Sequence, residues 1–112
     1  MPRKIIKNKI TKKEQEQFKI VCFYMANLGS EVQRIFSWKE KGDKETMQNA
    51  YKRATLIIDK IKSFNNESAN AEMDILQKFF DELILEKMEY SISRNQISSY
   101  FNPFALRVIN SL

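Results

Sequence analysis

The sequence contains no histidine and only one cysteine, Cys22. Without histidine the chain lacks the commonest general base and the commonest metal ligand. A single cysteine can neither close an internal disulfide nor form a structural zinc site, and we interpret Cys22 as a small core residue. We therefore expect no metal, no cofactor and no enzymatic activity.

Glycine and proline are scarce, with two of each, which disfavours a many-stranded β fold rich in turns. The glycines stand alone at Gly29 and Gly42, which excludes a glycine-rich phosphate loop. Long apolar runs are also missing, because the longest candidate, residues 20–30, is shorter than the roughly 18–20 residues that span a bilayer. The residues before it do not resemble a signal peptide either. We expect a cytoplasmic protein without a membrane partner.

What the sequence does contain is amphipathic helical patterning. Its longest segment begins at Thr11 and Glu14, spaced as in a capping box, and ends at Gly42, which suits a left-handed C-cap. This pattern predicts one helix roughly 45 Å long. Its expected buried seam consists of Phe18, Val21, Met25, Leu28, Val32 and Ile35.

A second helix is predicted from Asp43 to about Phe64. Asp43 is a good N-cap, and its position directly after Gly42 predicts a tight turn between antiparallel neighbours. The expected apolar stripe is Met47, Ala50, Ala54, Ile57, Ile61 and Phe64, widened by Tyr51 and Ile58.

Residues 65–70 are predicted to form a loop, with Ser68 or Asn70 capping a third helix. The inward residues of that helix are expected to be Met73, Leu76, Phe79, Phe80, Leu83 and Ile84. Its acids are Asp74, Asp81, Glu82, Glu86 and Glu89. We interpret them as a solvated face rather than as metal ligands, because di-iron bundles also require histidines.

A last helix should follow a turn at residues 91–95, with Ile97, Phe101, Phe104 and Val108 at helical spacing. Asn102 and Pro103 interrupt it, and two interpretations remain open: a restarted helix with proline at its first position, or one kinked continuous helix.

The predicted fold is all-α: an up-down-up-down four-helix bundle with a long first helix and a Pro-interrupted last helix. Residues 11–112 would form this single domain, preceded by a basic flexible arm, residues 1–10. A three-helix bundle with a loosely packed tail is the alternative.

Several apolar residues fall outside the predicted seams. On the first helix Ile20, Phe23 and Trp38 lie roughly opposite the seam, and Leu56 and Leu85 are out of phase on later helices. The fourth helix could cover the first three residues. Otherwise all five are candidates for a dimer contact or a partner-binding surface.

Basic residues are concentrated at the N-terminus. Six of the 19 basic residues and none of the 14 acidic residues lie within residues 1–13: Arg3, Lys4, Lys7, Lys9, Lys12 and Lys13. Such an arm could bind the phosphates of RNA or DNA in a salt-dependent manner, or it could simply favour solubility. No aromatic residue is interleaved, so base stacking is not supported.

Residues 38–61 resemble the second-helix region of the flagellin export chaperone family, through Gly42, Asp43, Ala54, Ile57 and Ile58. The segment is also similar to small helical-bundle proteins of bacteria whose function is uncharacterised. The resemblance implies a cytoplasmic four-helix bundle that holds an extended, partly helical export substrate on exposed apolar surfaces.

Our leading hypothesis is a non-enzymatic helical protein-interaction module, chaperone- or adaptor-like. It would bind a partner protein, or a second copy as a homodimer, through Ile20, Phe23, Trp38, Leu56 and Leu85. The alternative is a nucleic-acid-binding or ribosome-associated accessory protein that uses the basic arm.

Overall fold

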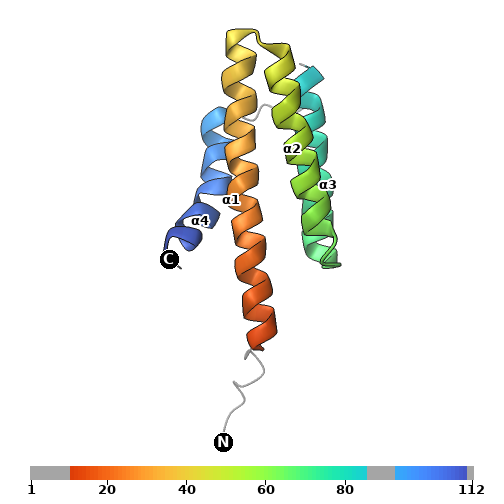
Figure 1. Cartoon of the computed structure of the whole chain (residues 1–112), viewed down its shortest axis with the longest axis vertical. Coiled ribbons are helices and arrows are strands. Elements are labelled where there is room, and N and C mark those ends of the chain that lie inside the picture. The colour runs from red at the N-terminus through yellow and green to blue at the C-terminus, as the bar shows by residue number, and fades with distance from the viewer. Residues whose placement is uncertain (1–10, 86–92, 111–112) are drawn as a thin grey trace, which may run out of the picture.

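The computed structural model describes residues 11–85 and 93–110, which form four helices (Figure 1). They are α1 (Lys12–Lys41), α2 (Lys44–Lys62), α3 (Glu67–Leu85) and α4 (Arg94–Asn110). These ranges contain no β-strand. The predicted all-α helical bundle is therefore confirmed.

Both ends of α1 are formed by the predicted caps. The Glu14 amide donates to Thr11 Oγ1 and the Thr11 amide donates to Glu14 Oε1, each at 3.0 Å, which completes the capping box. Hydrogen bonds to its carboxylate from the backbone amide and from the side chain of Thr11 lower the pKa of Glu14. At the other end Gly42 has φ 75°, a left-handed conformation that costs glycine little, and Asp43 then caps α2.

The helices alternate in direction along the bundle. The short turn at Gly42 and Asp43 makes α2 antiparallel to α1. Lys39 Nζ, near the end of α1, donates to the carbonyl of Leu83, near the end of α3, at 2.7 Å, so α3 runs parallel to α1. Contacts at both ends of α4 show that it runs down α1 again, which gives the predicted up-down-up-down order.

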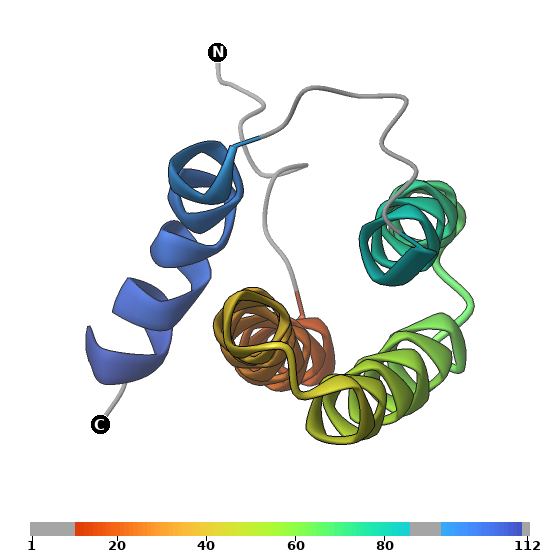
Figure 2. The same cartoon turned by 90° about the horizontal axis from the view of Figure 1, so that it is seen from above.

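The four helices do not close into a ring. Viewed along the bundle, they form a curved row in the order α4, α1, α2, α3, with α3 and α4 at its two ends (Figure 2). α1 packs against α2 and α4, and α2 packs against α3, whereas α3 and α4 are not packed against each other. The side of the bundle between α3 and α4 is therefore open.

The core lies between α1, α2 and α3, and α4 adds Ile97 and Phe101 to it. Most predicted inward residues are buried there. From the first three helices the core contains Met25, Leu28, Val32, Ile35, Met47, Ala50, Ala54, Ile58, Ile61, Met73, Leu76, Phe79, Phe80 and Leu83.

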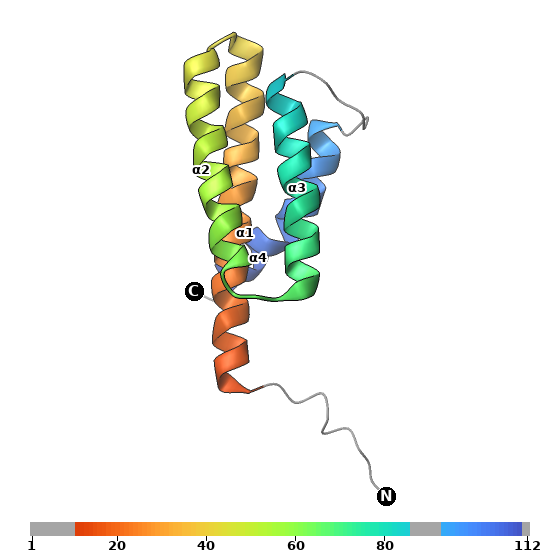
Figure 3. The ribbon, with the colours of Figure 1, turned by 90° about the vertical axis from the view of Figure 1, so that its right-hand side faces the viewer.

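One predicted core position is wrong. Phe18 is 47% exposed, although it is in phase with the buried seam. α1 is longer than its neighbours, and its N-terminal turns extend past the connection between α2 and α3 (Figure 3). The helical phase of Phe18 was predicted correctly, but its ring faces the guanidinium of Arg107 and an open pocket rather than packed apolar side chains, which leaves it exposed.

The start of α3 also differs from the prediction. Asn66, rather than Ser68 or Asn70, caps the helix: the Ala69 amide donates to Asn66 Oδ1 at 2.9 Å, and α3 already begins at Glu67. The preceding residue, Asn65, adopts φ 58°, which reverses the chain in fewer residues than a six-residue loop would need. α4 continues through Pro103 as one helix, as in the second of the two open interpretations.

The acidic side of α3 is not a uniformly solvated face. Asp81 is half-buried and accepts hydrogen bonds from the Tyr51 hydroxyl at 2.5 Å and from Gln77 at 2.9 Å. Glu82 is half-buried as well. The predicted face is therefore partly a polar contact with α2, while Glu86 and Glu89 lie outside the described residues.

Candidate functional site

An apolar groove lies where α3 and α4 face each other. Its cavity has a volume of about 410 Å³. We call it the α3–α4 groove and define it by its lining residues, Glu72, Ile75, Leu76, Phe79, Gln96, Ile97 and Tyr100. Five of these seven side chains are apolar or aromatic, so the groove is suited to another apolar surface.

The α3 wall is apolar because of the helical spacing of its residues. Glu72, Ile75 and Phe79 follow one another at intervals of three and four, which places them on one side of α3. Phe79 reaches the core, whereas Ile75 is 68% exposed. Covering such apolar surface is favourable by about 25 cal/mol per Å² removed from water. Covering the exposed Ile75 side chain with an apolar partner surface would therefore favour binding, and this side chain lies beside a pre-formed cavity.

One hydrogen bond crosses between the two walls. The Tyr100 hydroxyl on α4 donates to Glu72 Oε1 on α3 at 2.5 Å, and the Tyr100 ring packs edge-on against Phe101 with centroids 4.9 Å apart. Burial raises the pKa of Tyr100, and the hydrogen bond and charge of Glu72 raise it further. The hydroxyl therefore stays protonated and remains a donor at neutral pH.

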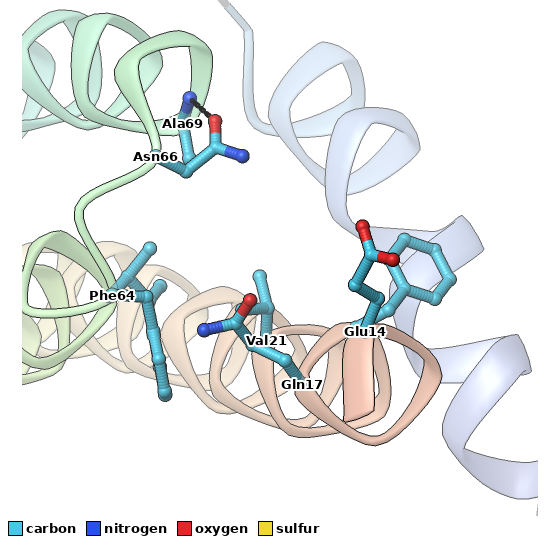
Figure 4. Close-up of a pocket in the computed structure, with 8 residues that line it drawn as sticks. Glu14, Gln17, Val21, Phe64, Asn66 and Ala69 are labelled. Atoms are coloured by element: carbon cyan, nitrogen blue, oxygen red, sulfur yellow. Dashed lines mark hydrogen bonds between the residues drawn. The ribbon is translucent and has the colours of Figure 1, made fainter. Parts of the chain in front are cut away.

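A second pocket lies nearer the N-terminus of α1, with a volume of about 370 Å³ (Figure 4). It is lined by Glu14, Gln17, Phe18 and Val21 of α1 and by Ile61, Phe64, Asn66 and Ala69 around the turn between α2 and α3. The guanidinium of Arg107 lies 4.9 Å from the ring centre of Phe18. This pocket is also mainly apolar, with one carboxylate at its edge.

The five candidate partner-binding residues do not form one surface. Ile20 and Phe23 are 45% and 53% exposed on α1. α4 does not cover them, because it packs along a different side of α1, where Gly29 meets Phe101. Leu56 is 68% exposed on α2.

Trp38 and Leu85 lie elsewhere, and they line one cavity between the ends of α1 and α3 and the start of α2. Trp38 is half-buried against the core, and the ammonium of Lys41 lies 4.6 Å from its ring centre. Trp38 therefore does not share a face with Ile20 and Phe23, while Leu85 remains 63% exposed.

Two of the six candidate nucleic-acid-binding residues lie in the described part of the chain. Lys12 and Lys13 are exposed in the first turn of α1. The other four candidates, Arg3, Lys4, Lys7 and Lys9, lie outside the described residues.

Other charged groups hold the helices together. Glu31 is buried and accepts hydrogen bonds from Arg34 at 2.9 Å and from Arg53 of α2 at 3.1 Å. Arg94 joins α4 to α1 through Gln33 at 2.8 Å and through further bonds to that helix. We therefore assign these clusters to the packing of α1 with α2 and α4.

The described residues form neither a metal-binding cluster nor a reactive thiol site. No group of three or more acidic or cysteine side chains there is positioned to hold a metal ion. Cys22 is buried, and burial raises the pKa of its thiol. A thiol with a raised pKa is a poor nucleophile at neutral pH.

The sequence analysis did not single out the groove. Ile75 lies outside the inward stripe of α3, as Leu56 does on α2, so the same search for out-of-phase apolar residues could have found it. The facing residues Gln96 and Tyr100 carry no such signal, because their role depends on how far α4 lies from α3.

Comparisons with protein-family models, curated proteins and solved structures find no match. No helix in the described part of the chain is long and apolar enough to cross a membrane. The function is therefore argued from the groove and its residues.

Proposed function

We propose that this protein is a helical protein-interaction module, chaperone- or adaptor-like, that binds a helical segment of a partner protein in the α3–α4 groove. The observation that carries the proposal is the exposed Ile75 beside an apolar cavity whose two walls are not packed together. Insertion of an amphipathic helix into such a groove is a common mode of peptide recognition.

The arrangement of the helices supports a helix as the occupant. α3 and α4 stand at the two ends of a curved row (Figure 2), and both helices line the groove, so a helix lying along it would contact both walls. It would bury Ile75 and the exposed part of Tyr100. The resemblance of residues 38–61 to flagellin export chaperones favours the same class of function.

The test uses a photo-reactive amino acid placed at one of two positions of the full chain in its native host. Ile75 and Leu56 are matched, since both are helical, apolar and 68% exposed, but only Ile75 lines the groove. We expect position 75 to cross-link to one specific protein and position 56 to give background only. Equal labelling from both positions would refute the groove as the binding site.

The same experiment identifies a homodimer. A cross-link from position 75 to a second copy of this chain would make the groove a self-association interface, and sedimentation at several concentrations would then show a dimer. In a pull-down of the captured partner by the chain without the photo-reactive residue, Ile75→Ser should abolish binding and Leu56→Ser should retain it.

A further inference from the structure

We infer that the helix bound in the α3–α4 groove is α3 of a second copy of this chain, so that the two copies form a homodimer. The two α3 helices would run antiparallel across a twofold axis that passes beside Ile75. This inference rests on the proposed function and names its partner. It follows from the residues that flank Ile75 on the exposed side of α3.

On α3, an exposed apolar residue lies between two exposed residues of opposite charge. Glu72, Ile75 and Lys78 follow one another at intervals of three residues, and all three are exposed. These intervals place Glu72 nearly one turn before Ile75 and Lys78 nearly one turn after it, along one side of the helix. Glu72 and Ile75 line the groove directly. A surface that covers Ile75 therefore meets a negative group at one end and a positive group at the other.

This order of charges is self-complementary under twofold symmetry. In an antiparallel pair centred on Ile75, the residue three positions after the centre of one helix comes level with the residue three positions before the centre of the other. Lys78 of each copy would therefore come level with Glu72 of the other copy, which gives two pairs of opposite charge. A parallel pair in the same register would bring like charges level with each other, which opposes binding. Charge thus selects the antiparallel arrangement.

Both charged groups can take a further partner. Glu72 accepts the Tyr100 hydroxyl through Oε1, and a carboxylate has a second oxygen and about four acceptor positions in all. The Lys78 ammonium has three N–H donors, so it can bind a carboxylate of the second copy in addition to a partner within its own chain. The proposed pairs therefore do not require the Tyr100 bond to break.

The surroundings of Ile75 are suited to a second helix. Ile75 is 68% exposed and would pack against Ile75 of the other copy. Ala71, about one turn before it, is exposed and small, which allows two helices to approach closely. The α4 residues that line the groove, Gln96, Ile97 and Tyr100, are uncharged, so they repel neither charge of the incoming α3.

The inference is tested first by sedimentation velocity of the full chain at several concentrations. We expect the sedimentation coefficient to rise from a monomer value to a dimer value as the concentration increases. Ile75→Ser should weaken the dimer at least about tenfold, whereas Leu56→Ser, equally exposed but outside the groove, should leave its dissociation constant within about twofold. A parent chain that stays monomeric at every concentration would overturn the inference.

Reversing either charge alone should weaken the dimer. Glu72→Lys brings a lysine level with Lys78 of the other copy, and Lys78→Glu brings a glutamate level with Glu72. Like charges oppose association, so each variant should show a dissociation constant at least about tenfold larger than that of the parent. An unchanged dissociation constant in either variant would contradict the pairing.

A mixture of the two variants should recover association. In a mixed dimer, the lysine at position 72 of one chain comes level with the glutamate at position 78 of the other, while Lys78 of the first chain meets Glu72 of the second. Energy transfer between differently labelled chains should show the mixed dimer at least about tenfold tighter than either variant with itself. The Glu72→Lys chain lacks its Tyr100 bond in the mixture as well, so that bond cannot explain the recovery. No recovery would contradict the antiparallel arrangement.

A matched control changes the same charges elsewhere. Glu45 and Lys52 are exposed on α2 and do not line the groove. Glu45→Lys and Lys52→Glu should each leave the dissociation constant of the dimer within about twofold, and mixing them should bring no gain. Losses and recovery equal to those at positions 72 and 78 would show only a general charge effect and overturn the inference.

The two proposals can fail separately. If the chain is monomeric and position 75 still cross-links to one different protein, the homodimer inference is wrong and the proposed function stands. If cross-linking at position 75 equals that at position 56, both are wrong.

Discussion

The side chain of Phe101 occupies the space where Gly29 would carry a β-carbon. A Cβ built on Gly29 would lie 2.8 Å from Phe101 Cβ and 2.9 Å from its Cγ. The clashing atoms are the stem of the side chain, which moves only if the α4 backbone moves. This close approach lets α4 pack on α1.

Gly29→Ala should therefore destabilise the protein. Alanine in a helix interior gains about 1 kcal/mol over glycine, but forcing an atom into a packed contact costs about 1–3 kcal/mol. The net of these two effects should lower the free energy of unfolding in urea by up to about 2 kcal/mol. Ser30→Ala, at the exposed neighbouring position, is the control and should change it by less than about 0.5 kcal/mol. A more stable Gly29→Ala protein would show that α4 does not pack as described.

The bond between Tyr100 and Glu72 predicts a pH dependence. Tyr100 has a raised pKa in the folded protein, against an ordinary value of 10.0. The folded state therefore holds this proton when the unfolded state releases it, so this group's stabilising contribution is complete below pH 10 and is lost as the pH rises above it. Tyr100→Phe should lose less stability than the parent between about pH 10 and 11.

The measurement is the free energy of unfolding in urea at several alkaline pH values. Tyr51 also has a raised pKa, because it donates to Asp81, so Tyr51→Phe gives an independent comparison. Parallel curves for the parent and Tyr100→Phe would contradict the raised pKa of Tyr100.

Substitutions on the outer side of α1, at Ile20 and Phe23, should affect stability less than a substitution at Trp38, which packs against the core. Ile20 and Phe23 are exposed, so changing both to serine should alter the free energy of unfolding by less than about 0.5 kcal/mol per site. Trp38→Ser should cost more, about 2–4 kcal/mol, because Trp38 packs against the core. The groove proposal requires the double variant to keep its partner in a pull-down. Loss of the partner would instead assign binding to the outer side of α1.

The alternative function through the basic arm has its own test. If the protein binds RNA, deletion of residues 1–10 should remove nearly all of the affinity and its salt dependence together. Filter binding at two salt concentrations measures both. The full chain with Lys12→Gln and Lys13→Gln should lose only part of the affinity, because the other four basic residues of the arm remain. Equal RNA binding by the truncated chain would eliminate this mechanism.

Local features of the fold could be predicted from the sequence because each depends on a few adjacent residues. The capping box of Thr11 and Glu14 and the left-handed Gly42 are of this kind. The cap of α3 could not be chosen, since Asn66, Ser68 and Asn70 all carry suitable side chains within five residues. In the structure Asn66 caps α3, directly after Asn65 in its left-handed conformation.

The groove required the structure for a different reason. Helical periodicity predicts which residues face inward, but it does not predict whether the last helix closes against the third. Phe79 and Ile97 were both predicted to face inward, and both are buried, yet the helices that carry them are not packed together. Distances between elements far apart in sequence are not encoded in local spacing.

α4 packs closely against α1 alone, and the Tyr100–Glu72 hydrogen bond links it to α3 across the groove. Rotation of α4 about its contact at Gly29 would break the Tyr100–Glu72 hydrogen bond and widen the groove, while the direct packing of α1 with α2 and of α2 with α3 is retained. The width of the groove would thus vary with the position of α4, so that the groove accommodates helices with small or bulky side chains. Amide hydrogen exchange should then be faster in α4 than in the three helices of the core.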